Sequence, residues 1–136
     1  MKKFLFILMS IMMLSFTNVV NCSAQTYTYR TTGFSYKYKA SYGWTDWSPW
    51  ESSNMKLTIN YDDDIVIIYS KQMQVYHIYE YVSNYTDDSG GKQVKFNFID
   101  QDYDKGTMRM RIERNGNSQI YIDFADVMWV YNVVRI

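Results

Sequence analysis

The sequence is poor in the residues that most often build covalent or metal-dependent sites. Its 136 residues include one cysteine (Cys22), one proline (Pro49) and one histidine (His77). A zinc site needs several nitrogen or sulfur ligands, and Ser–His–Asp or Cys–His catalysis would depend entirely on His77. Alternation places His77 between Val75 and Tyr79 on an apolar strand face, where a core or wall residue is expected. The sequence therefore predicts no metal, no cofactor, no catalytic residue and a protein that is not an enzyme.

An excess of charge of one sign is also missing. Lysine and arginine together number 14, and so do aspartate and glutamate. Binding to nucleic acid needs a field of positive charge that replaces the counterions of the phosphates. Lys2 and Lys3 lie in a segment that we expect to be removed, which leaves the mature chain slightly acidic. We expect no nucleic-acid partner.

Long hydrophobic runs are absent as well, and the longest one, Phe4–Phe16, lies next to the N-terminus. It is too short for a stable membrane-spanning helix. It follows a basic start and precedes the small residues Cys22 and Ala24, an order typical of a secretory signal peptide. The sequence predicts a signal peptide over residues 1–24 and an exported protein without a membrane span, in the periplasm, on the cell surface or secreted.

Cys22 also permits a second interpretation. A lipoprotein signal is cleaved just before a cysteine that is then acylated. Val19 fits the position three residues before that cysteine, whereas Asn21 departs from the small residue that the pattern requires. A lipid anchor at Cys22 therefore stays open as an alternative. In either case, residues 25–136 are expected to form a single β domain.

Apolar and polar residues alternate with a period of two through most of this domain, and no window favours a helix. Aromatic residues make up 18% of the chain, and tyrosine is favoured in strands. Gly33 lies where the alternation shifts by one, which predicts a bulge, and Asn115–Gly116 predicts a hairpin. The sequence predicts about eight antiparallel strands in a meander that forms a small closed or nearly closed barrel. A two-sheet β-sandwich is the alternative.

Apolar side chains that share one face of each strand are expected to fill the interior. A barrel of about eight strands has room for such side chains or for one small ligand, seldom for both. The residues expected inside are Met73, Val75, Phe96, Phe98, Met108, Met110, Ile112, Ile120, Ile122 and Phe124.

Three tryptophans at three-residue spacing, Trp44, Trp47 and Trp50, mark the longest loop. Over this short stretch the chain resembles the W-x-x-W-x-x-W signature of thrombospondin type 1 repeats, although the cysteine framework of that family is absent. The resemblance implies stacking between tryptophan and arginine planes, for which Arg109 and Arg111 are the candidates. The loop is expected to plug one end of the barrel, with an exposed binding platform as the alternative.

The aspartates of the segment Asp100–Gly106 alternate as in a calcium-binding loop. The glycine comes one residue late, and Arg111 stands where an EF-hand needs a bidentate glutamate. We expect a hairpin turn with Gly106 in the left-handed conformation, and calcium binding stays open.

Two further resemblances concern larger parts of the chain. Calycins combine an early Gly-x-Trp with an arginine on the last strand, and Gly43–Trp44 with Arg135 matches about half of that pattern. Most of the mature domain resembles short secreted β-rich proteins of Bacteroidetes-type bacteria. The resemblance lies in the signal ending, the tryptophan segment Gly43–Trp50, the Ile65–Tyr81 hairpin and the last strand. This resemblance implies export but brings no activity.

The favoured function is a non-catalytic extracytoplasmic binding module. Its partner is expected to be a protein, with inhibition of an extracellular hydrolase as one form of that role, and Trp44, Trp47 and Trp50 would make the contact. One alternative is a calycin-like barrel that holds a small ligand near His77, Tyr79 and Tyr131. The other alternative is carbohydrate binding by the exposed aromatic rings.

Overall fold

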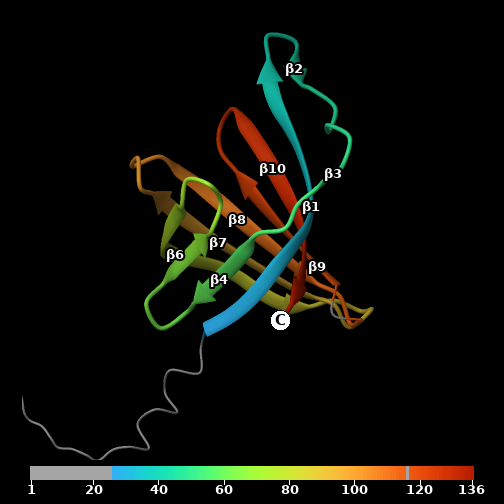
Figure 1. The fold of residues 1–136 in the computed structure, drawn as a ribbon, viewed down its shortest axis with the longest axis vertical. Helices are drawn as coiled ribbons and strands as arrows, with labels where there is room; N and C mark the ends of the chain where they lie inside the picture. The colour runs from blue at the N-terminus through green and yellow to red at the C-terminus, as the bar shows by residue number, and fades with distance from the viewer. Residues whose placement is uncertain (1–25, 116) are drawn as a thin grey trace, which may run out of the picture.

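The computed structural model describes residues 26–115 and 117–136, so the predicted signal peptide and the lipid-anchor alternative lie outside the described residues. The described chain forms ten antiparallel strands (Figure 1). They are β1 (Thr26–Ala40), β2 (Gly43–Trp44), β3 (Glu51–Ser52), β4 (Lys56–Asn60), β5 (Ile65–Ile68), β6 (Gln74–Thr86), β7 (Lys92–Asp100), β8 (Lys105–Ile112), β9 (Asn117–Asp123) and β10 (Val127–Arg135).

Eight of these strands close into a barrel, which confirms the favoured fold and excludes the two-sheet sandwich. From β4 to β10 each strand pairs with the next in sequence, and β1 pairs with both β4 and β10. The β1–β10 pairing runs from Tyr29↔Arg135 to Tyr38↔Val127. Closure gives every barrel strand two partners, so the backbone donors and acceptors that an open sheet would expose at its edges are paired.

Strand β1 is longer than its neighbour β4 and runs on past it. Its first residues pair with β4, whereas residues 33–40 face the segment that contains β2 and β3 (Figure 1). The register shifts between Thr31 and Gly33, which confirms the predicted bulge. A side chain at Gly33 would meet Trp50 and Asn132 at 3.3 and 3.2 Å, so the bulge also lets the tryptophan segment approach the barrel wall closely.

The barrel interior is filled in part by the side chains that alternation predicts. Six of the predicted core residues are at most 2% exposed, and Ile112 and Phe124 pack against them while remaining partly exposed. The six predicted residues are Phe96, Phe98, Met108, Met110, Ile120 and Ile122. The other strands contribute Tyr29, Leu57, Ile59, Val66, Ile68, Tyr76, Ile78, Tyr131 and Val133 to the core.

The predicted inward face of β6 is wrong. Met73 precedes the strand and is 51% exposed, Val75 is only half-buried, and Tyr76 and Ile78 point into the core instead. Both faces of this stretch carry apolar residues, so the period of two does not choose between them. The ring of Tyr76 packs edge-on against Phe98 at 4.8 Å, and its hydroxyl donates to Oε1 of Gln74 at 2.6 Å. A tyrosine on this face thus buries its ring and keeps its hydrogen bond.

The β7–β8 turn also differs from the expectation. Tyr103 adopts the left-handed conformation, with φ of 66°, in place of Gly106. Asp100 accepts hydrogen bonds from the backbone amides of Asp102 and Asp104, both at 2.9 Å. These bonds define a side-chain-stabilised turn. Within residues 26–115 and 117–136, no three histidine, cysteine or acidic residues lie close enough together to hold a metal ion.

Gly106 is needed for space rather than for its backbone angle. A Cβ atom there would lie 2.6 Å from both the carbonyl oxygen of Asp123 and Cζ of Phe98. We expect Gly106→Ala to lower the free energy of unfolding by about 1–3 kcal/mol in denaturant titrations. Gly33→Ala is the matched comparison, because its nearest neighbours are side chains that can move. Equal losses in the two variants would contradict this explanation.

Candidate functional site

One end of the barrel holds a cleft that the core does not fill. Its volume is about 690 Å³, within the range of ordinary small-molecule sites. Its lining includes residues near the start of β1 and the end of β10. Figure 1 shows this end of β10 at the label that marks the C-terminus. We call this cleft the tyrosine cleft, and its lining residues are Tyr27, Tyr29, Tyr61, Tyr81, Val82, Ser83, Asn84, Lys92, Val94, Ile112 and Arg135.

Three different elements bring the four tyrosines of the cleft together. Tyr27 and Tyr29 are two residues apart on β1 and so share its inner face. Tyr61 follows β4, and its ring contacts those of Tyr27 and Tyr81 at 5.6 and 6.3 Å. Tyr81 turns inward because the β6–β7 register shifts between Ile78 and Glu80. The bulge in β6 therefore brings the ring of Tyr81 into contact with the group of tyrosine rings from the other two elements.

Three of the tyrosine hydroxyls of the cleft, those of Tyr29, Tyr61 and Tyr81, have raised pKa values and stay neutral over the physiological pH range. Burial raises the pKa of Tyr61 to about 12, and burial also raises the pKa of Tyr29 against the opposing effect of Arg135. The pKa of Tyr81 is raised by burial and by its hydrogen bond to Asp64, to which its hydroxyl donates at 2.7 Å. Neutral phenols can both donate and accept hydrogen bonds.

Two cations and no carboxylate line the tyrosine cleft. The guanidinium carbon of Arg135 lies 4.4 Å from the centre of the Tyr27 ring. Lys92 is the first residue of β7, on the same face as the buried Phe96. Val94 and Ile112 pack against the hydrophobic core and supply apolar surface. The cleft therefore combines an apolar interior, hydroxyl groups and positive charge.

The tryptophan segment lies on the outer wall of the barrel, so the expected plug is wrong. The amide of Thr45 donates to the carbonyl of Tyr38 at 2.9 Å, and that of Ser48 donates to the carbonyl of Tyr36 at 2.7 Å. Ser35, which is 1% exposed, donates to the carbonyl of Ser48. The segment follows β1 because this part of the strand lies beyond β4 and would otherwise present an unpaired edge.

Two of the three tryptophans keep much of their surface exposed. Trp47 is 38% and Trp50 52% exposed, whereas Trp44 is half-buried. Trp47 meets the ring of Tyr121 edge-on at 6.1 Å, beside a shallow groove of about 470 Å³ on the outer wall. We call Trp44, Trp47, Trp50 and Tyr121 the tryptophan face.

The cation at the tryptophan rings is a lysine, so the predicted arginine partners are wrong. Lys37 places its ammonium 4.8 Å from the Trp47 ring and 5.7 Å from that of Trp44. Arg109 stacks on Tyr121 at 4.3 Å and binds both carboxylate oxygens of Asp123. Arg111 belongs to a different ion-pair network. A lysine two residues after Ser35 on the same strand face is nearer to the segment than either arginine.

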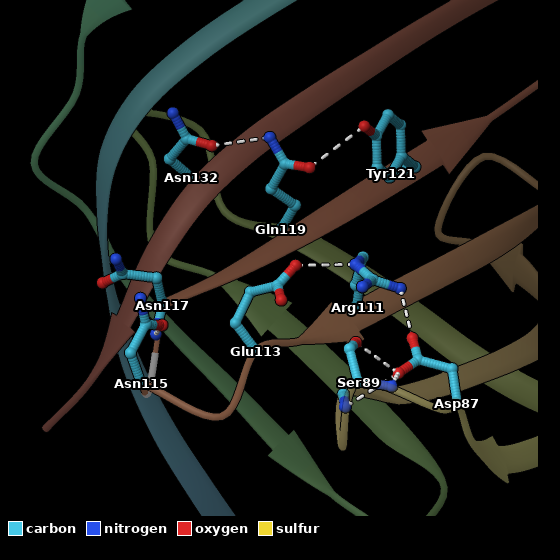
Figure 2. A network of polar contacts seen from close by, with 10 residues as sticks. Asp87, Ser89, Arg111, Glu113, Asn115, Asn117, Gln119, Tyr121 and Asn132 are labelled. Atoms are coloured by element: carbon cyan, nitrogen blue, oxygen red, sulfur yellow. Dashed lines mark hydrogen bonds and ion pairs between the residues drawn. The ribbon is translucent and has the colours of Figure 1, made fainter.

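Two groups of polar side-chain contacts lie along β8, β9 and β10, one around Gln119 and one around Arg111 (Figure 2). Gln119 donates to Asn132 at 3.0 Å and accepts from the Tyr121 hydroxyl at 3.1 Å. Arg111 bridges Glu113 at 2.7 Å and Asp87 at 2.8 Å. The contacts around Gln119 hold polar groups next to the tryptophan face.

The hydrogen bonds of Asp87 give stability a pH dependence. Ser89 and then Arg111 hold the pKa of Asp87 well below its usual value of 3.8. The unfolded chain therefore takes up a proton before the folded chain does, so stability falls as the pH drops below about 4. We expect Asp87→Asn to lose less stability than the natural chain between about pH 4 and pH 2 in thermal unfolding. Asp88→Asn, outside this network, is the control, and identical acid profiles for Asp87→Asn and the natural chain would contradict the assignment.

The structure does not bring together His77, Tyr79 and Tyr131, the residues near which the sequence predicts a ligand pocket. His77 is exposed and Tyr79 is 54% exposed, on the outer face of β6, whereas Tyr131 is 4% exposed inside the barrel. The residues separate because the face of β6 that carries His77 and Tyr79 points outward. Sequence reasoning missed the tyrosine cleft, although the inward alternation of Tyr27 and Tyr29 and the position of Arg135 on the last strand were usable signals.

Comparison of the chain with protein families, with curated proteins and with solved structures finds no match. Among the residues that the structure describes, no helix is long and apolar enough to cross a membrane.

Proposed function

We propose that the chain is a non-catalytic binding domain of the extracytoplasmic space that holds one small molecule in the tyrosine cleft. The observation that carries this proposal is the cleft itself, about 690 Å³ at one end of a barrel whose other parts are densely filled. Up-and-down barrels of eight strands commonly bind a ligand at one mouth.

The chemistry of the cleft favours binding over catalysis. Its lining contains no carboxylate and no histidine, and burial raises the pKa values of Tyr29, Tyr61 and Tyr81. His77 lies on the outer wall, so it does not contribute an acid or base there. Phenol rings and aliphatic side chains offer apolar contact, and the hydroxyls orient a ligand by hydrogen bonds.

Filling the cleft tests this proposal. We expect the neutral fluorophore N-phenyl-1-naphthylamine to bind the natural chain with enhanced emission. Asn84→Trp should weaken that binding about ten-fold or more, because Asn84 lies opposite Val94 and the introduced indole would occupy the cleft. Ser41→Trp introduces the same side chain in the exposed turn after β1 and should leave binding unchanged. Unaltered binding by a folded Asn84→Trp variant would place the fluorophore elsewhere and refute the proposal.

We also propose the tryptophan face as a contact surface for a protein partner. The specific observation is that Trp47 and Trp50 remain 38% and 52% exposed although hydrogen bonds hold their segment against β1. Exposed aromatic side chains on a rigid support lose little conformational entropy on binding and often dominate interface energies. An extracellular hydrolase is one candidate partner. A glycan, which would stack on the same rings beside Gln119 and Asn132, is the other candidate.

Truncation of both exposed tryptophans distinguishes these occupants. The immobilised natural chain is presented to candidate secreted hydrolases and to a glycan array, in parallel with Trp47→Ser/Trp50→Ser. We expect the double variant to weaken hydrolase binding by about 30-fold or more, since each anchor contributes more than about 1 kcal/mol. Tyr103→Ser, which removes another exposed aromatic ring in the β7–β8 turn, is the control. Selective loss of glycan binding would identify the second candidate instead, and equal binding by all three chains would refute this role of the face.

A further inference from the structure

We infer that the ligand of the tyrosine cleft is an amphipathic organic anion, with an apolar body and one acidic group such as a carboxylate. This inference rests on the proposed function and adds the chemical class of the ligand. Its starting point is the charge of the lining, which contains Lys92 and Arg135 and no acidic residue.

Both cations occupy positions whose alternation directs them to the barrel interior. Lys92 precedes Val94, Phe96 and Phe98 at intervals of two along β7, and the two phenylalanines are fully buried. Arg135 follows Tyr131 and Val133 in the same way along β10. Both side chains are exposed, so water solvates their charges in the absence of a ligand, and an anion bound in the cleft can replace that water. Their location at the last inner position before the cleft opens places positive charge around its mouth.

Neither cation has a protein counter-ion in the described part of the chain. The ion pairs found there use Arg109 and Arg111. Arg135 instead stacks on the ring of Tyr27 at 4.4 Å. A stacked guanidinium keeps its edge free, and that edge matches a carboxylate through two parallel hydrogen bonds. The stacking contact therefore orients the group that would bind the anion.

The remaining lining separates apolar and polar surface. Val94 and Ile112 adjoin the packed core, whereas the hydroxyl-bearing rings and the two cations surround the cleft. Neutral phenols beside Arg135 can donate additional hydrogen bonds to an acidic group. A ligand with its apolar body against Val94 and Ile112 and its acidic group at Arg135 satisfies both kinds of surface, and a neutral apolar ligand satisfies only one.

Two fluorophores that share one skeleton test the inference. 8-Anilinonaphthalene-1-sulfonate differs from N-phenyl-1-naphthylamine by its sulfonate group, so their dissociation constants on the natural chain measure the contribution of the anion. We expect the sulfonate to bind about ten-fold more tightly, as charge-assisted hydrogen bonds allow. Rising salt should weaken only the sulfonate, because screening acts on its charge.

Variants then assign the preference to residues. The double variant Lys92→Gln/Arg135→Gln should lose about ten-fold or more in sulfonate binding and keep neutral binding within about two-fold. Arg30→Gln, an exposed arginine of β1 outside the lining, is the matched control. Equal affinity of the natural chain for the two fluorophores, or equal loss of both in the folded double variant, would overturn the inference and leave the cleft as a site for neutral ligands. Absence of binding by either fluorophore would refute the proposed function together with it.

Discussion

The antiparallel pairing of β1 with β10 is the constraint on which the rest of the structure depends. It joins the two ends of the domain and turns a meander into a closed barrel. Its loss would expose two long backbone edges, each with unpaired donors and acceptors. The same pairing brings Tyr29 opposite Arg135 at one end, and further along it brings Lys37, which contacts the Trp47 ring, opposite Met128. Both candidate sites therefore depend on contacts between residues about a hundred positions apart.

The unequal lengths of neighbouring strands explain where the two candidate sites lie. Strand β1 has 15 residues and β4 has five, so most of the edge of β1 that faces β4 needs another partner. The tryptophan segment provides it, and its aromatic side chains then lie on the outer wall. At the other end, β6 and β7 extend past the filled core, and the bulges of β6 direct Tyr81 toward Tyr61. A surface site and a cleft result from the same mismatch of strand lengths.

Alternation along the chain predicts the antiparallel strands and the core residues of β7, β8 and β9, because these strands carry apolar residues on one face and polar residues on the other. It leaves the barrel and the two-sheet sandwich as alternatives, and the β1–β10 pairing decides between them. It failed on β6, where Val75 and Tyr79 compete with Tyr76 and Ile78 for the interior. The choice is made by contacts with β5 and β7, which no local pattern contains. The tyrosine cleft was missed for the same reason, since Tyr61 and Tyr81 meet only after closure. The tryptophan segment was located correctly but placed at a barrel end, because sequence does not show which strand edge lacks a partner.

The tyrosines of the barrel fall into two groups, one buried in the filled core and one lining the open cleft. Tyr76 and Tyr131 lie among core residues, are at most 4% exposed, and the hydroxyl of Tyr76 donates to Gln74. Tyr27 and Tyr61 pack their rings together at the mouth and leave room between the strands. A phenol at the mouth can complete its hydrogen bonds with water or with a ligand, so the cleft costs little stability when it is empty. The packed core therefore supplies most of the buried apolar surface, whereas the tyrosine end of the barrel contains the cleft.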